Sequence, residues 1–235
     1  MARPSPVTAM PYQLRSDHSF CRVDGRVVLL DLTGDRYFRL QPELERVLVA
    51  HLVEGADCTE DELAHLAALG VLTEDAQQTP FFDRVAPTPP RRSALEEAPL
   101  SAAIPFGAQL RTLVLVAKLS IALKTRALIN ILASVSNERA ARTPGAETAR
   151  SIDESGLIDA AGTFARARLA VPIETCCLLD SLSLLRFLSG RGLFARLVMG
   201  VTGSPFSAHC WVQAGDLVLN DSVGHAMAHT PIRVI

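Results

Sequence analysis

The chain of 235 residues lacks a strong charge imbalance and has few lysines. Its formal net charge is −2, and lysine occurs only at positions 118 and 124. The sequence as a whole therefore gives no electrostatic reason to expect binding to nucleic acid or acidic lipid. Five cysteines, an odd number without framework spacing, indicate free thiols in a reducing compartment, so a cytoplasmic location is expected.

Several other motifs are missing. The sequence has no Gly-Lys dipeptide, which excludes a phosphate-binding G-x-x-x-x-G-K-[ST] loop, and no cofactor motif is recognised. Its N-terminus has no basic region followed by an apolar one, so no signal peptide is expected. The apolar segment 110–133 is interrupted by four basic residues, which favours a core helix over a membrane span. Adjacent cysteines without C-x-x-C spacing form a poor zinc site, so no metal is expected.

The N-terminal third of the sequence has the signals of three strands followed by two helices. Three short strands are predicted at 19–23, 26–32 and 36–40, separated by Asp-Gly and Gly-Asp turns. A helix is predicted from Pro42 to about residue 53, and a second helix begins at the capping-box pair Thr59 and Glu62. Gly55 and Gly70 are the expected helix ends.

A proline-rich segment indicates a boundary between two domains. Prolines at 80, 87, 89, 90 and 99 predict a linker over 77–105, between a domain at 12–76 and another at 106–235. In the second domain, 136–155 is expected to be polar and mobile, and 158–170 to be a short helix. Segment 110–133 is predicted as one long helix, with one side formed by Leu110, Leu113, Val114, Ala117, Ile121 and Leu128.

Segment 174–221 contains the residue types that a cysteine hydrolase needs. Thr175 is the predicted N-cap of a helix ending at Gly190, which places Cys176 and Cys177 in the first turn. Unpaired backbone N–H groups and the helix dipole favour a thiolate there. A strand at 194–201 and a hairpin formed by 208–213 and 217–221 follow.

The hairpin is predicted to bring an imidazole and a carboxylate together. A three-residue loop centred on Gly215 places His209 directly opposite Asp221, with both side chains on one face. A two-residue loop would break this pairing. Granted the longer loop, the segment offers a helix-N-terminal thiol, an imidazole and an orienting carboxylate, the three groups of nucleophilic acyl transfer.

Neighbouring residues have alternative interpretations. Cys176 is the rival nucleophile, because adjacent helix residues point about 100° apart and only one of them can face the hairpin. Cys210 alternates with His209 along the strand and is expected to point into the core. Residues expected at the surface are Asp180, His225 and His229.

Four blocks of this segment resemble the C-terminal domain of lasso-peptide biosynthesis B proteins. They are Cys-Leu-Leu-Asp-Ser-Leu at 177–182, Ala-Arg-Leu-Val-Met-Gly-Val at 195–201, Ala-His-Cys-Trp-Val at 208–212 and Val-Leu-Asn-Asp at 218–221. That domain is a papain/transglutaminase-like cysteine peptidase that removes the leader from a ribosomally made precursor. The resemblance implies that Cys177 is the nucleophile, His209 the base and Asp221 the orienting acid. It also implies ATP-dependent processing and transfer of the product to an asparagine-synthetase-like lasso cyclase.

The segment 20–40 is similar to the leader-recognition element of the same family, a winged-helix-like (PqqD-like) module. The predicted edge strand 36–40 can hold an extended peptide by strand addition. Its alternation places Phe38 and Leu40 toward the core and leaves Tyr37 and Arg39 beside the leader. The residues expected to contact the leader are Arg36, Tyr37, Phe38 and Arg39.

The sequence thus predicts an α+β protein that binds the leader of a lasso-peptide precursor and cleaves it from the core peptide. Its expected partners are the precursor and the cyclase, without nucleic acid and without a membrane span. Two alternatives stay open. One is an inactive precursor-binding chaperone, and the other is a transglutaminase-like amidase or acyl transferase that acts on another substrate.

Overall fold

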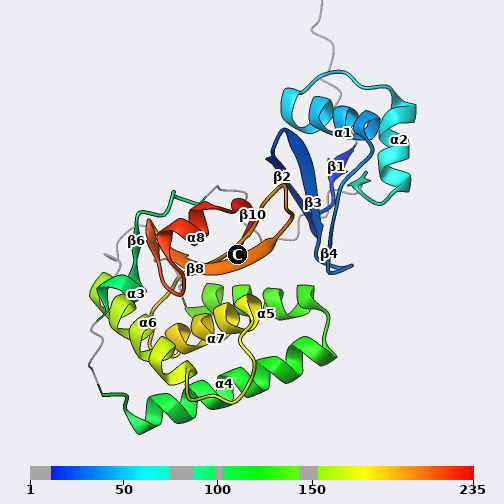
Figure 1. Ribbon diagram of the computed structural model, residues 1–235. Coiled ribbons are helices and arrows are strands. Elements are labelled where there is room, and N and C mark those ends of the chain that lie inside the picture. Colours follow the sequence, from blue (N-terminus) through cyan, green and yellow to red (C-terminus); the bar gives the residue numbers. More distant parts are fainter. Residues whose placement is uncertain (1–11, 75–86, 99–102, 143–152) are drawn as a thin grey trace, which may run out of the picture. The chain divides into compact units, whose positions relative to one another are not determined.

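The computed structural model describes residues 12–74, 87–98, 103–142 and 153–235 (Figure 1). The predicted tail 1–11 lies outside the described residues, as do parts of the predicted linker and of the predicted polar segment 136–155. The chain divides into two compact units, the first largely within residues 1–80 and the second largely within 81–235. Helices and sheets occur in both units, which confirms the α+β class.

The first unit contains a three-stranded sheet in the order β2-β3-β4. β2 is His18–Val23, β3 is Arg26–Asp31 and β4 is Arg36–Phe38. The turn between β2 and β3 has φ values of 50° at Asp24 and 76° at Gly25, as a two-residue hairpin requires. β3 is central and β4 borders only β3 among the described strands, as predicted. β4 is two residues shorter than expected.

The predicted start and end signals of the two helices in this unit are confirmed. α1 (Pro42–Val49) continues into a π-helical turn (Ala50–Glu54) that stops at Gly55, where φ is 62°. α2 (Glu60–Ala68) begins at Thr59 with the predicted capping box to Glu62. Two-residue strands β1 (Gln13–Leu14) and β5 (Leu72–Thr73) pair antiparallel, and neither is long enough to show a period in the sequence.

The helices pack on the sheet through an apolar core and one buried carboxylate. Glu45 Oε1 accepts the Val27 N–H at 2.7 Å and so joins α1 to β3. Leu40 is buried, as predicted, and Phe38 packs against the same cluster. The buried members of this core are Tyr12, Val27, Leu29, Leu40, Leu48, Leu63, Leu66, Val71 and Leu72.

The second unit is built on a five-stranded sheet in the order β10-β7-β8-β9-β6. β6 runs parallel to β9, whereas the other neighbours are antiparallel. β6 and the short helix α3 (Ala94–Glu97) fall inside the predicted linker 77–105, so this part of it has regular structure, contrary to the expectation from its prolines. Both elements are too short for a periodic signal. The strands are β6 (Arg92–Ser93), β7 (Arg196–Val201), β8 (Ala208–Ala214), β9 (Leu217–Val218) and β10 (Thr230–Val234).

Helix α7 (Cys177–Ser189) is the centre of this unit (Figure 1). It packs against β7 and β8 on one face of the sheet, and α4, α5 and α6 pack around it. Its apolar side chains Leu182, Leu184 and Phe187 are fully buried. α8 (Val223–Met227) contributes Ala226 to a second cluster with Trp211. The helices around α7 are α4 (Phe106–Thr125), α5 (Leu128–Arg142) and α6 (Glu154–Arg168).

The predicted long helix 110–133 is wrong in two respects. Arg126 has extended backbone, with φ −129° and ψ 147°, and separates α4 from α5. In addition, α4 buries Ala108, Thr112, Val116 and Leu119, whereas Leu110 and Ile121 of the predicted side are 50% and 64% exposed. The segment is apolar almost all round, so its periodicity did not identify the side that packs. α5 also extends to Arg142, into the segment expected to be mobile.

Candidate active site

Cys177 is the first residue of α7, and Cys176 is its N-cap with φ −143° and ψ 131°. The cap lies one residue later than the predicted Thr175. The Asp180 N–H donates to the Cys176 carbonyl at 2.9 Å, so the N–H of Cys177 precedes the first bond of the helix. First-turn N–H groups have no partner inside the helix and carry the positive end of its dipole. This position favours an anionic Cys177 sulfur.

A buried arginine holds the loop that leads to Cys177. The Arg168 guanidinium donates to the carbonyls of Ile173 at 2.9 Å and Glu174 at 3.0 Å. It also donates to Asp180 Oδ1 at 2.6 Å, so Asp180 is an ion-pair partner and the prediction of a solvent-facing acid was wrong. Arg168 thereby ties the end of α6 to the first turn of α7.

His209 and Asp221 form a close polar contact at the site. His209 Nε2 and Asp221 Oδ2 lie 2.7 Å apart, and their side chains are 15% and 14% exposed. The Ser222 N–H donates to Asp221 Oδ1 at 2.8 Å. Burial acts to raise the pKa of Asp221, but these hydrogen bonds outweigh it and lower the pKa. Asp221 is therefore a carboxylate at neutral pH.

The hairpin that supplies these two residues does not have the predicted register. Gln213 pairs with Val218 and Ala214 with Leu217, so the loop contains two residues and not three. Gly215, the first of them, has φ 61°, a conformation that glycine adopts without strain. In this register His209 and Asp221 are not opposite each other.

Asn220 explains how they meet. The Leu219 N–H still donates to the Val212 carbonyl at 2.8 Å, but the Val212 N–H donates to the Asn220 side-chain oxygen at 2.7 Å. An amide side chain thus replaces the next backbone acceptor, and the strand pairing ends there. The chain then turns, which brings Asp221 to His209.

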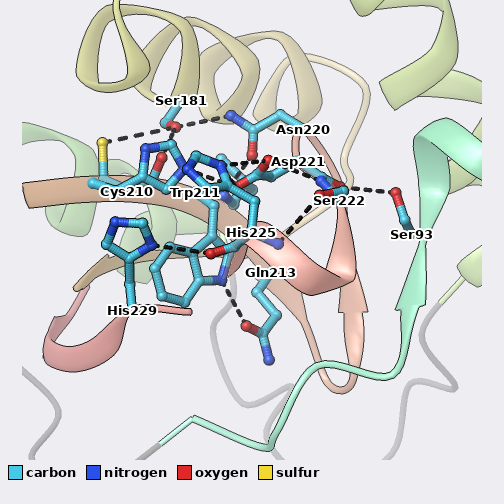
Figure 2. A network of polar contacts seen from close by, with 12 residues as sticks. Ser93, Ser181, Cys210, Trp211, Gln213, Asn220, Asp221, Ser222, His225 and His229 are labelled. Atoms are coloured by element: carbon cyan, nitrogen blue, oxygen red, sulfur yellow. Dashed lines mark hydrogen bonds and ion pairs between the residues drawn. The ribbon is translucent and has the colours of Figure 1, made fainter. Parts of the chain in front are cut away.

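The same asparagine reaches the central helix. Asn220 Nδ2 donates to Ser181 Oγ at 2.9 Å, and Ser181 Oγ donates to the Cys210 carbonyl at 3.2 Å (Figure 2). From the other side, Ser93 Oγ donates to the Asp221 carbonyl at 2.8 Å. Ser93 could not be found from the sequence, because it lies in the segment taken as a linker. Asn220 stands in the block 218–221, although nothing in that block indicated its role.

Cys177 contacts both His209 and Cys210, and these contacts set its charge. Side-chain hydrogen bonds from Cys210 and His209 lower the pKa of Cys177 to about 4, against the opposing effect of burial. Burial also acts to lower the pKa of His209, but its hydrogen bonds to Asp221 and Cys177 raise the pKa to about 9. At neutral pH the pair is therefore a thiolate and an imidazolium.

Cys210 is buried, as predicted, and its Sγ lies 3.9 Å from Ser181 Oγ. Its hydrogen bond to Cys177 and its burial raise its pKa well above the ordinary range, so it stays a neutral thiol. Cys210 is thus a neutral thiol next to the Cys177 sulfur, a proximity that strand alternation did not predict.

Two further histidines lie beside the pair. Both were expected at the surface, which is confirmed for His225 and wrong for His229. His225 Nδ1 is 3.1 Å from Asp221 Oδ1, and its ring centroid is 4.3 Å from that of His209. His229 is 5% exposed, and its ring centroid lies 5.1 Å from that of His209. They belong to α8 and to the residue before β10, which the sequence had not predicted. His225, with a half-exposed side chain, is the more accessible of the two.

A glycine leaves room for this cluster. Gly200 of β7 pairs with His209 of β8. A Cβ at Gly200 would lie 3.0 Å from the His229 Cβ and 2.9 Å from the Trp211 ring. Any larger residue at this position would therefore displace the rings that pack beside His209.

Two groups of described residues have spacings that a metal ion could bridge, namely His209, Asp221 and His225, and Asp17, His18 and Asp31. In the first group Asp221 is already hydrogen bonded to both imidazoles. In the second, Asp17 lies 2.9 Å from the His18 ring and accepts from Thr33 at 2.7 Å. In both groups an aspartate is thus already hydrogen bonded to protein side chains.

Comparison with known proteins places the chain in a family. The model of a family described as the transglutaminase-like superfamily matches residues 113–234, just over half of the chain. The chain is also 46% identical over 46 residues to the microcin J25-processing protein McjB of Escherichia coli. That match covers 20% of this chain and 22% of McjB, about a fifth of each, and it confirms the resemblance to lasso-peptide biosynthesis B proteins. No solved structure matches the chain.

Proposed function

Since this chain belongs to the transglutaminase-like superfamily, we propose that it is a cysteine peptidase that cleaves the leader from a lasso-peptide precursor. The observation that carries this proposal is the arrangement of three side chains. Cys177 stands at the start of α7 in contact with His209, and His209 is held by Asp221 at 2.7 Å. These are the nucleophile, base and orienting acid of acyl transfer.

In the proposed reaction the Cys177 thiolate attacks the carbonyl carbon that joins leader and core. The carbonyl π electrons move to oxygen, and the N–H of Cys177 at the helix start can donate to that oxyanion. The C–N bond then breaks as the His209 imidazolium gives its proton to the leaving amine, which frees the core peptide. The leader is left as a thioester on Cys177.

Water completes the cycle. His209, now neutral, takes a proton from water as the oxygen attacks the thioester, and the C–S bond breaks to release the leader carboxylate. The Cys177 thiolate and the His209 imidazolium are restored. Because Asp221 holds Nε2 of His209, the other ring nitrogen, Nδ1, is the one available to Cys177 and to the leaving amine. Asp221 thus fixes both the ring orientation and the tautomer.

We also propose that residues 12–76 form the winged-helix-like (PqqD-like) element that holds the leader. The position of β4 at the edge of the described sheet supports strand addition there. Arg36 lies over the Phe38 ring at 5.3 Å and pairs with Asp31 at 3.1 Å, so both residues are ordered parts of this edge. Tyr37 and Arg39 complete the proposed leader contact.

Five free cysteines support the proposal that the reaction takes place in the cytoplasm. The family resemblance adds ATP dependence and delivery of the core peptide to the asparagine-synthetase-like cyclase as further proposals. The function is tested by incubating the full-length protein with a synthetic precursor and separating the products by mass spectrometry. We expect a free leader and a free core peptide. An inactive chaperone would bind the precursor and leave it intact, and an amidase of other specificity would neither bind nor cleave it.

A further inference from the structure

Helix α4 exposes a row of apolar side chains, which we call the α4 stripe. Phe106, Leu110, Val114 and Ile121 are 77%, 50%, 41% and 64% exposed, and Leu113 is 39% exposed. Their spacing of three, four and seven residues places them on one side of the helix. The proposed cleavage reaction uses none of them.

The opposite side of α4 is fixed within the second unit. Ala108, Thr112, Val116 and Leu119 are buried, and the helix packs against α6 and α7. By length and composition α4 could cross a membrane, with a mean hydropathy of 1.5. However, a helix packed on protein along one side can meet a bilayer only with its other side, lying along the surface.

The charged residues of helix α4 itself all have one sign. No acidic residue occurs between Glu97 and Glu138, whereas both lysines of the chain, Lys118 and Lys124, lie on α4 and are exposed. Arg126 follows them and is exposed as well. The net charge of −2 is a sum over the whole chain and does not describe this segment.

The chemistry of the stripe selects the kind of partner. From Phe106 to Ile121 the exposed side chains of this helix are all apolar except Lys118. A folded protein partner is recognised through directional polar contacts as well as apolar ones. A lipid headgroup layer requires only apolar side chains that enter the acyl boundary and cations whose stems can reach the phosphates. The α4 stripe fits the second case.

We propose that the α4 stripe binds the surface of an anionic bilayer. The apolar side chains Phe106, Leu110, Val114 and Ile121 enter the headgroup–acyl boundary, while Lys118 and Lys124 extend to the lipid phosphates. The second unit is then held at the membrane surface with α4 parallel to it. This goes beyond the proposed function and does not depend on it.

The test is co-sedimentation of the full-length protein with vesicles. We expect binding to mixed phosphatidylcholine–phosphatidylglycerol vesicles, about tenfold weaker binding to pure phosphatidylcholine, and weakening by added salt. The double variant Leu110→Gln/Val114→Gln should lose binding about tenfold, since it removes buried apolar area. Lys118→Gln/Lys124→Gln should reduce the difference in affinity between the anionic and the neutral vesicles.

Leu169→Gln is the matched control. Leu169 is 87% exposed and is the C-cap of α6, outside the residues of the α4 stripe, so its replacement should leave vesicle binding unchanged. Circular dichroism melting of each variant checks that the fold is retained. A wild-type protein that stays in the supernatant with anionic vesicles would overturn the proposal, including the case in which it self-associates through the stripe instead. Equal loss of binding in Leu169→Gln and in the stripe variant would overturn it too.

Discussion

His209 and Asp221 are hydrogen bonded at 2.7 Å although the register of their hairpin pairs neither with the other. The connection depends on Asn220, whose side chain accepts the Val212 N–H in place of a backbone carbonyl. Asp221 can then leave the strand pairing and approach the imidazole. The orientation of His209 is therefore set by an amide side chain as much as by the sheet.

This relationship predicts that Asn220→Ala slows cleavage without abolishing it. The substitution removes the bonds to Val212 and Ser181, so His209 and Asp221 lose their fixed geometry. We expect kcat to fall about 100-fold with little change in KM, as a displacement of about 1 Å can cause. The acidic and basic limbs of the pH–rate profile should also move. Asn220→Asp, which keeps the acceptor for Val212, should recover part of the rate; an unchanged profile in Asn220→Ala would contradict a positioning role.

The pKa values of the pair predict the pH range of activity. Cys177 must be ionised, which holds above its pKa of about 4, and His209 must be protonated to aid the leaving amine, which holds below its pKa of about 9. Cleavage should therefore be bell-shaped, falling as the pH drops toward 4 and as it rises through 9. Iodoacetamide labelling of Cys177 should persist to about pH 5.

His209→Ala is the control for that range. Without the imidazolium the pKa of Cys177 should rise, and labelling at pH 6 should slow, because less of the thiol is ionised. If the labelling rate of wild-type Cys177 rises with pH only near the pKa of an ordinary thiol, the ion pair of Cys177 and His209 is contradicted.

Arg168 is predicted to support both stability and catalysis. Arg168→Met leaves Asp180 and the carbonyls of the loop before Cys177 without their donor. Because the Arg168 side chain is 7% exposed and Asp180 is 20% exposed, we expect a loss of about 3 kcal/mol in the free energy of unfolding. Urea unfolding measures this. Asp180→Asn keeps the bonds from Arg168 to the carbonyls and should lower the free energy of unfolding by less. Equal losses in the two variants would show that these carbonyl bonds add nothing to the ion pair.

Leader binding is predicted to depend on the edge of the first unit. Tyr37 is half-buried and Arg39 is exposed, both at the β4 edge. Tyr37→Ala/Arg39→Ala in the full-length protein should weaken leader affinity by about tenfold, the typical effect of losing one or two interface side chains. Calorimetry with the isolated leader measures the affinity, and labelling of Cys177 should be unaffected. Unchanged affinity would place the leader elsewhere.

The parts of the fold found from the sequence are those with local chemical signals. The capping box of Thr59 and Glu62 and the glycines at 55 and 70 fixed both ends of α2 and the end of the preceding helix. Strands β7 and β8 were found because they are long and apolar. The choice of Cys177 over Cys176 as the nucleophile came from the family blocks and stays a prediction.

What was missed required three-dimensional contacts. β6, α3 and α8 have two, four and five residues, too few for a period. The side of α4 that packs could not be chosen because both sides are apolar. The loop of the hairpin was assigned one residue too many, since Ala214-Gly215-Asp216 permits either length and only the pairing of Gln213 with Val218 decides it. Buried roles for Arg168 and His229 have no sequence signal of their own.

The central claim is that Cys177, and not its neighbour Cys176, forms the acyl-enzyme. Cys176 is the exposed N-cap, whereas Cys177 is half-buried and in contact with His209. The most direct measurement is mass spectrometry of the full-length protein quenched in acid during turnover of a precursor peptide, followed by peptide mapping. The account predicts a leader thioester on Cys177, its absence in Cys177→Ala and its persistence in Cys176→Ala. A thioester on Cys176, or precursor cleavage by Cys177→Ala at the wild-type rate, would contradict it.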